Sequence, residues 1–346
     1  MTGMDQRLGL SLPLVSKIPT SYAHGLAFLF TSSYVGSLYL SQHLFASWGS
    51  PDHSPSQTPP TAEGFGEEKR EPLPPISATD VDGSGMEGDG PKLGNRDHPL
   101  TIKRRMKAAA TSTLLSIGGI YGVVQYLGNY TMMGAIEPTL KYLGLPSRFS
   151  PPERLSPYLL APIIMLGPLY AMYLNNDIPF ISWKRSGDTW FGMLRREWGL
   201  VEFRNYIVGP VTEELVFRST ILAAYLLDGF SLKSLVFGTP LWFGIAHAHH
   251  GFETYKRNGR TREAAIRAVV ASIFQLTYTT LFGWFASFLY LKTGSVMPPL
   301  TAHIYCNVMG IYLPTSAIRS NPHRVFLIWG AYLTGIVGFS YGLWVL

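Results

Sequence analysis

The most constraining feature of this sequence is a series of apolar stretches that recurs along almost the whole chain. A helix that crosses the hydrocarbon core of a bilayer needs about 20 mostly apolar residues. The chain is 47% hydrophobic and only 14% charged, whereas soluble domains average about 25% charged residues. We therefore predict an all-α, polytopic integral membrane protein with about eight transmembrane helices, over residues 21–44, 108–128, 157–174, 204–228, 231–249, 264–291, 295–313 and 324–346.

A polar segment separates the first of these spans from the second. Residues 49–106 are rich in Pro, Gly, Ser and acidic residues and poor in apolar ones. Such a composition cannot bury enough apolar surface to fold, so we predict a disordered loop. The loop divides the chain into an N-terminal segment with the first transmembrane helix, residues 1–48, and a membrane-embedded core, residues 107–346, whose polar motifs lie within 204–313.

The basic residues predict how the chain is oriented in the bilayer. The formal net charge is +6, but Lys and Arg lie in short loops rather than on one continuous face, so we expect a lipid bilayer and no nucleic acid as partner. Loops after spans one, three, five and seven hold about twice as many basic residues as the other loops, which places them in the cytosol by the positive-inside rule. Residues 188–203 mix Trp and Phe with Arg and Glu at helical spacing, which predicts an interfacial helix.

The fourth span carries the first group of ionisable residues at membrane depth. Glu214 and Arg218 are four residues apart and share one helical face, where they can form an ion pair, while Glu213 is rotated by about 100° and points elsewhere. A charge at the bilayer centre costs roughly 2.5–3.5 kcal/mol on insertion scales. Charged residues at this depth therefore indicate a structural or functional cause.

Two further spans carry polar pairs at the same spacing. Phe243 and His247 are four residues apart in the fifth span, and His303 and Asn307 are four apart in the seventh. Each residue alone is as compatible with helix packing as with function, since polar groups also form hydrogen bonds between helices in membranes. Three such pairs in three spans favour a site, because a carboxylate, imidazoles and a carboxamide can bind a water, take its proton and stabilise an oxyanion.

In this order the motifs resemble the three signatures of the type II CaaX prenyl endopeptidases, the Ras-converting enzymes. The resemblance covers about residues 200–313, and the flanking residues are more similar to the eukaryotic enzymes than to the bacterial ones. The signatures are Glu-Glu-x-x-x-Arg at Glu213, Glu214 and Arg218, Phe-x-x-x-His at Phe243 and His247, and His-x-x-x-Asn at His303 and Asn307.

The resemblance implies a multi-pass enzyme of the endoplasmic reticulum with a conical cavity in the membrane, reached from the cytosol. Such an enzyme removes the last three residues, -aaX, from prenylated CaaX proteins, which include Ras- and Rho-like small GTPases and lipidated peptide pheromone precursors. Carried over by position, Glu213 is the general base, His247 helps to hold the water, and His303 and Asn307 resemble the oxyanion-stabilising pair. Glu214, Arg218 and Phe243 are expected to support the site, and no metal or other cofactor is implied.

Three other interpretations stay open at this point. A zinc peptidase is possible on ligand types, since His249 and His250 add to the histidines above, although the sequence HExxH is absent. A thiol mechanism would use Cys306, the only cysteine, which follows His303 by three residues. A transporter with a buried proton relay is the alternative outside enzymes, and we find no inverted internal repeat that would favour it.

Overall fold

In the computed structural model, every regular secondary-structure element of the described residues is a helix. The structure describes residues 12–13, 15–46, 97–146, 154–181, 192, 198–247 and 249–346, with the backbone alone for 42–46, 247, 249–250, 253 and 257. The elements are α1 (Thr20–Ala46), α2 (Pro99–Gly128), α3 (Ile136–Tyr142), α4 (Ser156–Ile164), α5 (Leu166–Asn175), α7 (Leu200–Phe203), η3 (Arg204–Val208), α8 (Gly209–Glu214), η4 (Leu215–Thr220), α9 (Ile221–Asp228), α10 (Leu232–Phe237), α11 (Pro240–His247), α12 (His249–Arg257), α13 (Arg262–Thr293), α14 (Met297–Met309), α15 (Pro314–Ser320), η5 (Pro322–Arg324) and α16 (Val325–Val345).

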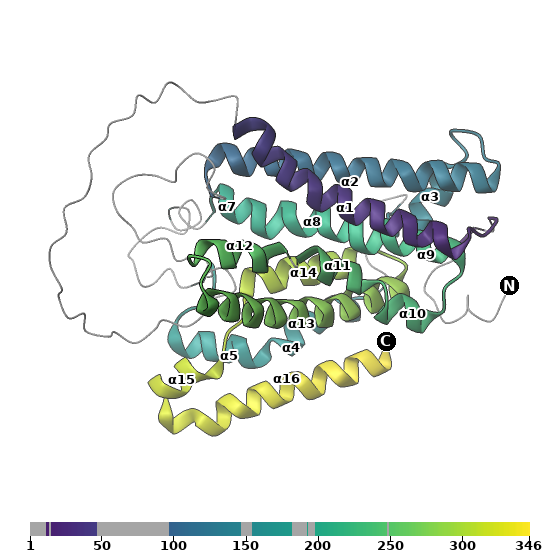
Figure 1. Cartoon of the computed structure of the whole chain (residues 1–346). Helices are drawn as coiled ribbons and strands as arrows, with labels where there is room; N and C mark the ends of the chain where they lie inside the picture. Colours follow the sequence, from purple (N-terminus) through teal and green to yellow (C-terminus); the bar gives the residue numbers. More distant parts are fainter. Residues whose placement is uncertain are drawn as a thin grey trace, which may run out of the picture.

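The helices form one bundle in which successive long segments run in alternate directions (Figure 1). Helix α1 packs on α2 and α9, α13 packs on α11 and α14, and α16 packs on α4 and α5. The start of α2 lies with α7, α12 and α15 at one end, and α3 and α10 lie at the other. The described parts of the loops that we predict to be cytosolic therefore gather at a single end.

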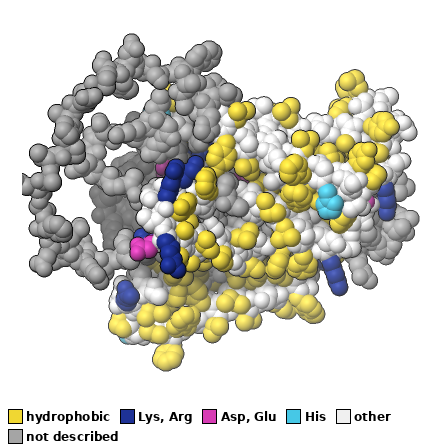
Figure 2. All heavy atoms as spheres, in the orientation of Figure 1, with side chains coloured by type: hydrophobic (Ala, Val, Ile, Leu, Met, Phe, Trp, Pro, Cys, Tyr) yellow, Lys and Arg dark blue, Asp and Glu magenta, His cyan; other side chains and the backbone are white. Residues whose placement is uncertain are grey.

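Two helices in the described part of the chain are long and apolar enough to cross a membrane. They are α13 and the segment Pro322–Val345, and the bent pair α4 and α5 makes a third if it is counted as one span. Figure 2 shows hydrophobic side chains along the flank of the bundle, with the visible Lys and Arg side chains toward its ends. This distribution suits a bilayer, whose core is apolar and whose surfaces are wet. The count of eight spans stays a prediction.

Several predicted spans are interrupted. The span at 157–174 bends by 52° between α4 and α5, where an unbroken helix would press the ring of Pro168 against the Ile164 carbonyl. The span at 231–249 breaks before Pro240, between α10 and α11. The predicted seventh span ends at Met309, which leaves α14 about 20 Å long at 1.5 Å per residue, short of a bilayer core of about 30 Å.

The predicted polar loop ends earlier in the structure than the sequence suggested. Helix α2 begins at Pro99, so residues 99–106, which we predicted as disordered loop, are helical. The ring of Pro99 suits the first helical turn, and His98 caps that turn by accepting a hydrogen bond from the Leu100 amide at 3.3 Å. Residues 49–96 of the predicted loop and most of the predicted interfacial helix at 188–203 lie outside the described residues.

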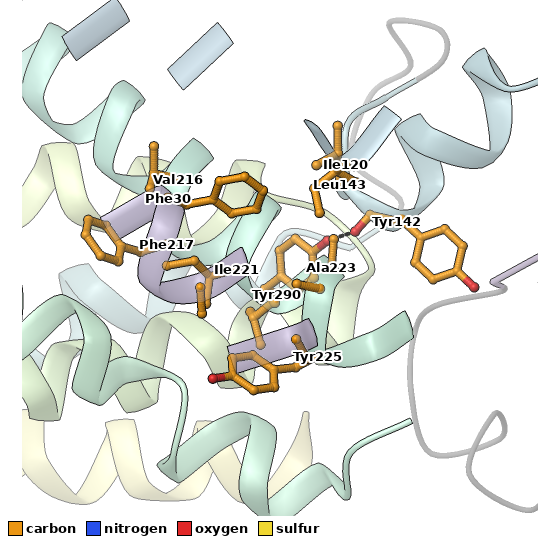
Figure 3. Packing of buried hydrophobic residues seen from close by; sticks show 14 of the residues in the cluster. Phe30, Ile120, Tyr142, Leu143, Val216, Phe217, Ile221, Ala223, Tyr225 and Tyr290 are labelled. Atoms are coloured by element: carbon orange, nitrogen blue, oxygen red, sulfur yellow. Dashed lines mark hydrogen bonds between the residues drawn. The ribbon is translucent and has the colours of Figure 1, made fainter. Parts of the chain in front are cut away.

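The largest hydrophobic cluster joins α1, α2, η4, α9 and α13 (Figure 3). Its close packing extends to the turn after α3, where the Tyr290 hydroxyl donates to the Tyr142 carbonyl at 2.6 Å. Gly144 in that turn has φ +61°, and a Cβ there would lie 2.5 Å from the Tyr290 ring. The Gly144 carbonyl accepts from the Val296 amide at 2.9 Å, one residue before α14. This contact fixes the start of the helix that carries His303.

Candidate active site

The Glu-Glu-Arg motif lies on a continuous helical segment that is not a regular α-helix. Residues 204–208 and 215–220 are π-helical, on either side of α8, which ends at Glu214. π-Helical turns are rare in proteins overall. Those that occur are often found at functional sites, because they widen the helix and change the direction of side chains. Sequence periodicity gave no sign of these turns.

Glu214 and Arg218 form the ion pair that their spacing predicted. One Nη atom of Arg218 lies 3.2 Å from Glu214 Oε1, and both side chains are almost completely buried. Glu214 Oε1 also accepts a hydrogen bond from His303 Nδ1 at 2.7 Å. A carboxylate accepts only, so the proton of this bond is assigned to Nδ1. The distance is typical of a charge-assisted hydrogen bond.

Glu213 reaches the same imidazole from the other side. Its Oε2 lies 3.7 Å from His303 Nε2, and its side chain is 23% exposed, whereas that of Glu214 is fully buried. As expected, Glu213 and Glu214 point in different directions: they face opposite nitrogens of the His303 ring. However, both converge on His303, which places one imidazole between two acidic groups. The 3.7 Å gap is too long for a direct hydrogen bond.

Aromatic rings enclose the guanidinium of Arg218. Its Cζ lies 4.4 Å from the ring centroid of Phe243, on α11, and 5.6 Å from that of Phe282, on α13. Such contacts attract a cation to the face of the ring and are stronger when both groups are away from water. Phe282 is also 4.9 Å from the His303 ring, centroid to centroid. Phe243 therefore packs against the buried ion pair.

Asn307 is held by the backbone of η3, the π-helical turn before α8. Its Nδ2 donates to the Asn205 carbonyl at 3.0 Å, and the side chain is half-buried. A carboxamide nitrogen has two hydrogens, so one remains for another acceptor. Asn307 lies one turn beyond His303 on α14 and therefore on the same helical face.

His247 is the last residue of α11, four residues after Phe243. Its side chain, and those of His249 and His250, lie outside the described residues. Within the described side chains, no group of three or more His, Cys, Asp and Glu is arranged to hold a metal ion.

Contacts from distant helices complete the site, and the sequence did not single them out. Thr212, next to Glu213, donates to the Val208 carbonyl at 2.8 Å, so its oxygen is left to accept from the Tyr34 hydroxyl, 2.9 Å away on α1. Phe282 and Asn205 contribute as described above. Thr212 could have been noticed by its place beside the motif, but nothing local links it to Tyr34, 178 residues away.

This arrangement can perform acid–base chemistry. A buried ion pair joins one carboxylate to Arg218, and that carboxylate fixes the orientation of an imidazole. A second carboxylate, partly open to solvent, faces the free nitrogen of the ring. Orienting one residue through another in this way is typical of catalytic sites.

Known proteins resemble this chain over the same region. The family model of the Type II CAAX prenyl endopeptidase Rce1-like proteins matches residues 196–309. A protein from Arabidopsis thaliana, CAAX prenyl protease 2, is 43% identical over 137 residues, which cover 40% of this chain and 41% of that protein. The match therefore spans less than half the length of the plant protein. No solved structure is significantly similar to the chain.

Longer matches extend into the N-terminal part of the core. The human CAAX prenyl protease 2 is 32% identical over 248 residues, 67% of this chain and 68% of the human protein. The protein of that name from Saccharomyces cerevisiae is 26% identical over 248 residues, 67% of this chain and 76% of the yeast protein. The motifs, the geometry and these matches agree, and the chain belongs to the Rce1-like family of type II CAAX prenyl endopeptidases.

Proposed function

We propose that this protein hydrolyses the peptide bond after the prenylated cysteine of CaaX proteins and so releases the -aaX tripeptide. The observation that supports this most directly is the pair of neighbouring glutamates in different states of burial. Glu214 is buried and bound to Arg218 and His303, whereas Glu213 is partly exposed and faces His303 Nε2. The names of the relatives, CAAX prenyl protease 2, supply the substrate class.

In the proposed mechanism, Glu213 is the general base. A water in the gap between Glu213 and His303 Nε2 gives a proton to Glu213 as its oxygen bonds to the scissile carbonyl carbon. The carbonyl oxygen becomes an oxyanion, which Asn307, through its remaining N–H, and His303 stabilise. The carbon–nitrogen bond then breaks, and the proton on Glu213 passes to the leaving amine.

The remaining motif residues are assigned to support. Glu214 accepts from His303 Nδ1 and so keeps Nε2 directed at the reacting groups. Arg218 neutralises Glu214, and Phe243 packs on Arg218. For His247 we keep the role that the resemblance implies, holding the water together with Glu213. None of these steps uses a metal or a thiol, and Cys306 packs in a hydrophobic cluster with Leu160 and Ala302.

We further propose that the protein resides in the endoplasmic reticulum membrane as a multi-pass protein and that substrates reach its site from the cytosol. The gathering of the basic loops at one end of the bundle supports this orientation under the positive-inside rule. Ras- and Rho-like GTPases and lipidated pheromone precursors are the expected substrates, because such proteins end in a prenylated CaaX sequence.

The decisive experiment is cleavage of a farnesylated CaaX peptide by the purified full-length protein. We expect release of the tripeptide, no cleavage of the same peptide without its lipid, and a loss of about 10²–10⁴-fold in rate for Glu213→Gln. Activity of Glu213→Gln above a few per cent of wild type would remove Glu213 from the role of base.

The same assay distinguishes the other interpretations. Activity should survive excess EDTA or phenanthroline, and Cys306→Ala should remain active. Inhibition that added zinc reverses would support a metallopeptidase, and an inactive but folded Cys306→Ala would support a thiol enzyme. Solute uptake by reconstituted vesicles without peptide cleavage would support a transporter.

A further inference from the structure

Helix α13 contains none of the motif residues, yet it forms one wall of the candidate active site. Phe282 lies 4.9 Å from the His303 ring and 5.6 Å from the Arg218 guanidinium. At the neighbouring position, a Cβ on Gly283 would lie 2.6 Å from Pro240 and 3.4 Å from Arg218 Nη2. The helix is therefore pressed against the site along this stretch.

An aromatic row extends from Phe282 along the same face of α13. Phe274, Tyr278 and Phe282 are spaced four residues apart, which places them on one side of the helix. The rings of Phe274 and Tyr278 are 5.6 Å apart, and Tyr278 is close enough to Glu213 for the two groups to interact electrostatically. The row spans about 12 Å at 1.5 Å per residue.

Exposure changes steadily along this aromatic row. Phe274 is 57% exposed and Tyr278 36%, whereas Phe282 is half-buried against His303. The row thus leads from the outer surface of the bundle to the reacting groups. Val270 and Ile266 continue the same row away from the site, and they are exposed and aliphatic, as is Ile273, which is sufficient for contact with lipid. Among the exposed large hydrophobic residues of α13, aromatic rings occur only at Phe274 and Tyr278, where the row approaches the site, and this change needs a separate reason.

We propose that Phe274, Tyr278 and Phe282 form the surface along which the isoprenoid chain of the substrate lies, which rests on the function proposed above. The occupant must be apolar over most of its length and must end in a polar group at the site. A prenylated cysteine has this form, with a branched hydrocarbon chain attached to the peptide that is cut. Flat rings offer large contact areas at little entropic cost to such a chain.

The three residues have different parts in this arrangement. Phe282 contacts the portion of the chain next to the cysteine, since it lies beside His303. Tyr278 lies between Phe282 and Phe274, so its ring contacts the middle of the chain, and its hydroxyl, on the side of Glu213, donates a hydrogen bond to a peptide carbonyl. Phe274 is the outermost residue and contacts the far end of the isoprenoid chain. Its contribution to binding should therefore depend on the length of that chain.

Kinetics with two lipids test this assignment. Phe274→Ala should raise KM roughly three- to tenfold, more for a geranylgeranylated peptide than for a farnesylated one, with kcat within about twofold of wild type. Tyr278→Phe should keep KM and lower kcat equally for both lipids, whereas Tyr278→Leu should also raise KM. A purely structural role would lower the amount of folded protein without this dependence on chain length.

Ile273→Ala is the matched control. Ile273 is next to Phe274 in sequence and 60% exposed, but about 100° around the helix from it. The Ile273→Ala variant should leave KM unchanged for both the farnesylated and the geranylgeranylated peptide. An unchanged KM in folded Phe274→Ala, or an equal rise in Ile273→Ala, would overturn the proposal.

Photolabelling separates this proposal from the proposed function. A farnesyl analogue with a photoreactive group at the far end of its chain, attached to a CaaX peptide, should label the fragment containing Phe274 in both wild type and Glu213→Gln, whether or not the peptide is cut. Labelling confined to other helices would overturn the lipid surface. Labelling of Phe274 without any cleavage would instead refute the proposed function alone.

Discussion

His303 is the residue around which the candidate active site is arranged. One ring nitrogen is bound to a buried, neutralised carboxylate, and the other faces a carboxylate that solvent can reach. Because the two glutamates differ in burial and in partners, the same substitution should have different consequences at the two neighbouring positions.

Glu214→Gln should destabilise the fold more than Glu213→Gln. Loss of the Glu214 charge leaves the buried Arg218 cation without its counter-charge, which costs about 3–5 kcal/mol when one partner of a buried pair is removed. The Glu213 side chain is 23% exposed and lies 3.7 Å from His303 Nε2, whereas that of Glu214 is fully buried, so Glu213→Gln should stay within about 1 kcal/mol of wild type. Thermal unfolding of both variants in the same detergent measures the difference, and equal melting temperatures would contradict it.

Tyr34 and Thr212 give a second prediction at this scale. Tyr34→Phe removes one buried hydrogen bond and should cost about 1 kcal/mol, since Thr212 still donates to Val208. Thr212→Val leaves the buried Tyr34 hydroxyl without its acceptor and should cost more, about 1–3 kcal/mol. Both changes should lower kcat, because Thr212 precedes Glu213. The same unfolding assay checks the order, and a less stable Tyr34→Phe would refute the assigned donor direction.

At the scale of elements, small residues allow the outer helix α16 to approach the bundle. Gly335 lies against α4, where a Cβ would be 2.9 Å from the Ile163 carbonyl oxygen and 3.1 Å from that of Ile164. These are backbone atoms, which cannot move aside as a side chain can. Close contact through small residues is a common way for helices to associate in membranes, where lipid removes the hydrophobic drive between them.

Gly335→Ala should therefore separate α16 from α4 and destabilise the protein by about 1–3 kcal/mol. Gly330 is the matched control on the same helix, since a Cβ there would have nothing within 4 Å. Gly330→Ala should be neutral or stabilise by up to about 1 kcal/mol, because alanine favours the helix. Unfolding in detergent compares the two, and a neutral Gly335→Ala would show that α16 is not held at this point.

For the whole molecule, the alternating direction of the helices decides which residues share a side of the membrane. Lys256 on α12 and Arg319 on α15 are exposed at one end of the bundle, and Lys233 on α10 is exposed at the other. This grouping turns the proposed orientation into a measurable difference between single residues.

In sealed microsomes from a Cys306→Ala background, Lys256→Cys and Arg319→Cys should react with an impermeant thiol reagent added outside. Lys233→Cys should react only after the membrane is opened with detergent. Both expectations follow from the basic residues that favour the cytosolic side. The reverse pattern would overturn the orientation and the route by which substrates arrive.

The sequence by itself determined whatever depends on the period of the helix. Apolar stretches predicted helices at 21–44 and 264–291 that the structure contains as α1 and α13, and a spacing of four residues predicted the pairing of Glu214 with Arg218. Short-range geometry is the same in every α-helix, so these features can be inferred without knowing the fold.

Only the tertiary structure decided which of these helices meet, and where they break. The contact of His303 with Glu214 joins residues 89 apart, and that of Asn307 with Asn205 joins residues 102 apart. Neither contact, nor the place of Phe282 beside His303, follows from local spacing, because each depends on how the helices pack. The π-helical turns and the short α14 likewise arise where the backbone adapts to its neighbours, since polar backbone in a membrane must find its partners within the protein.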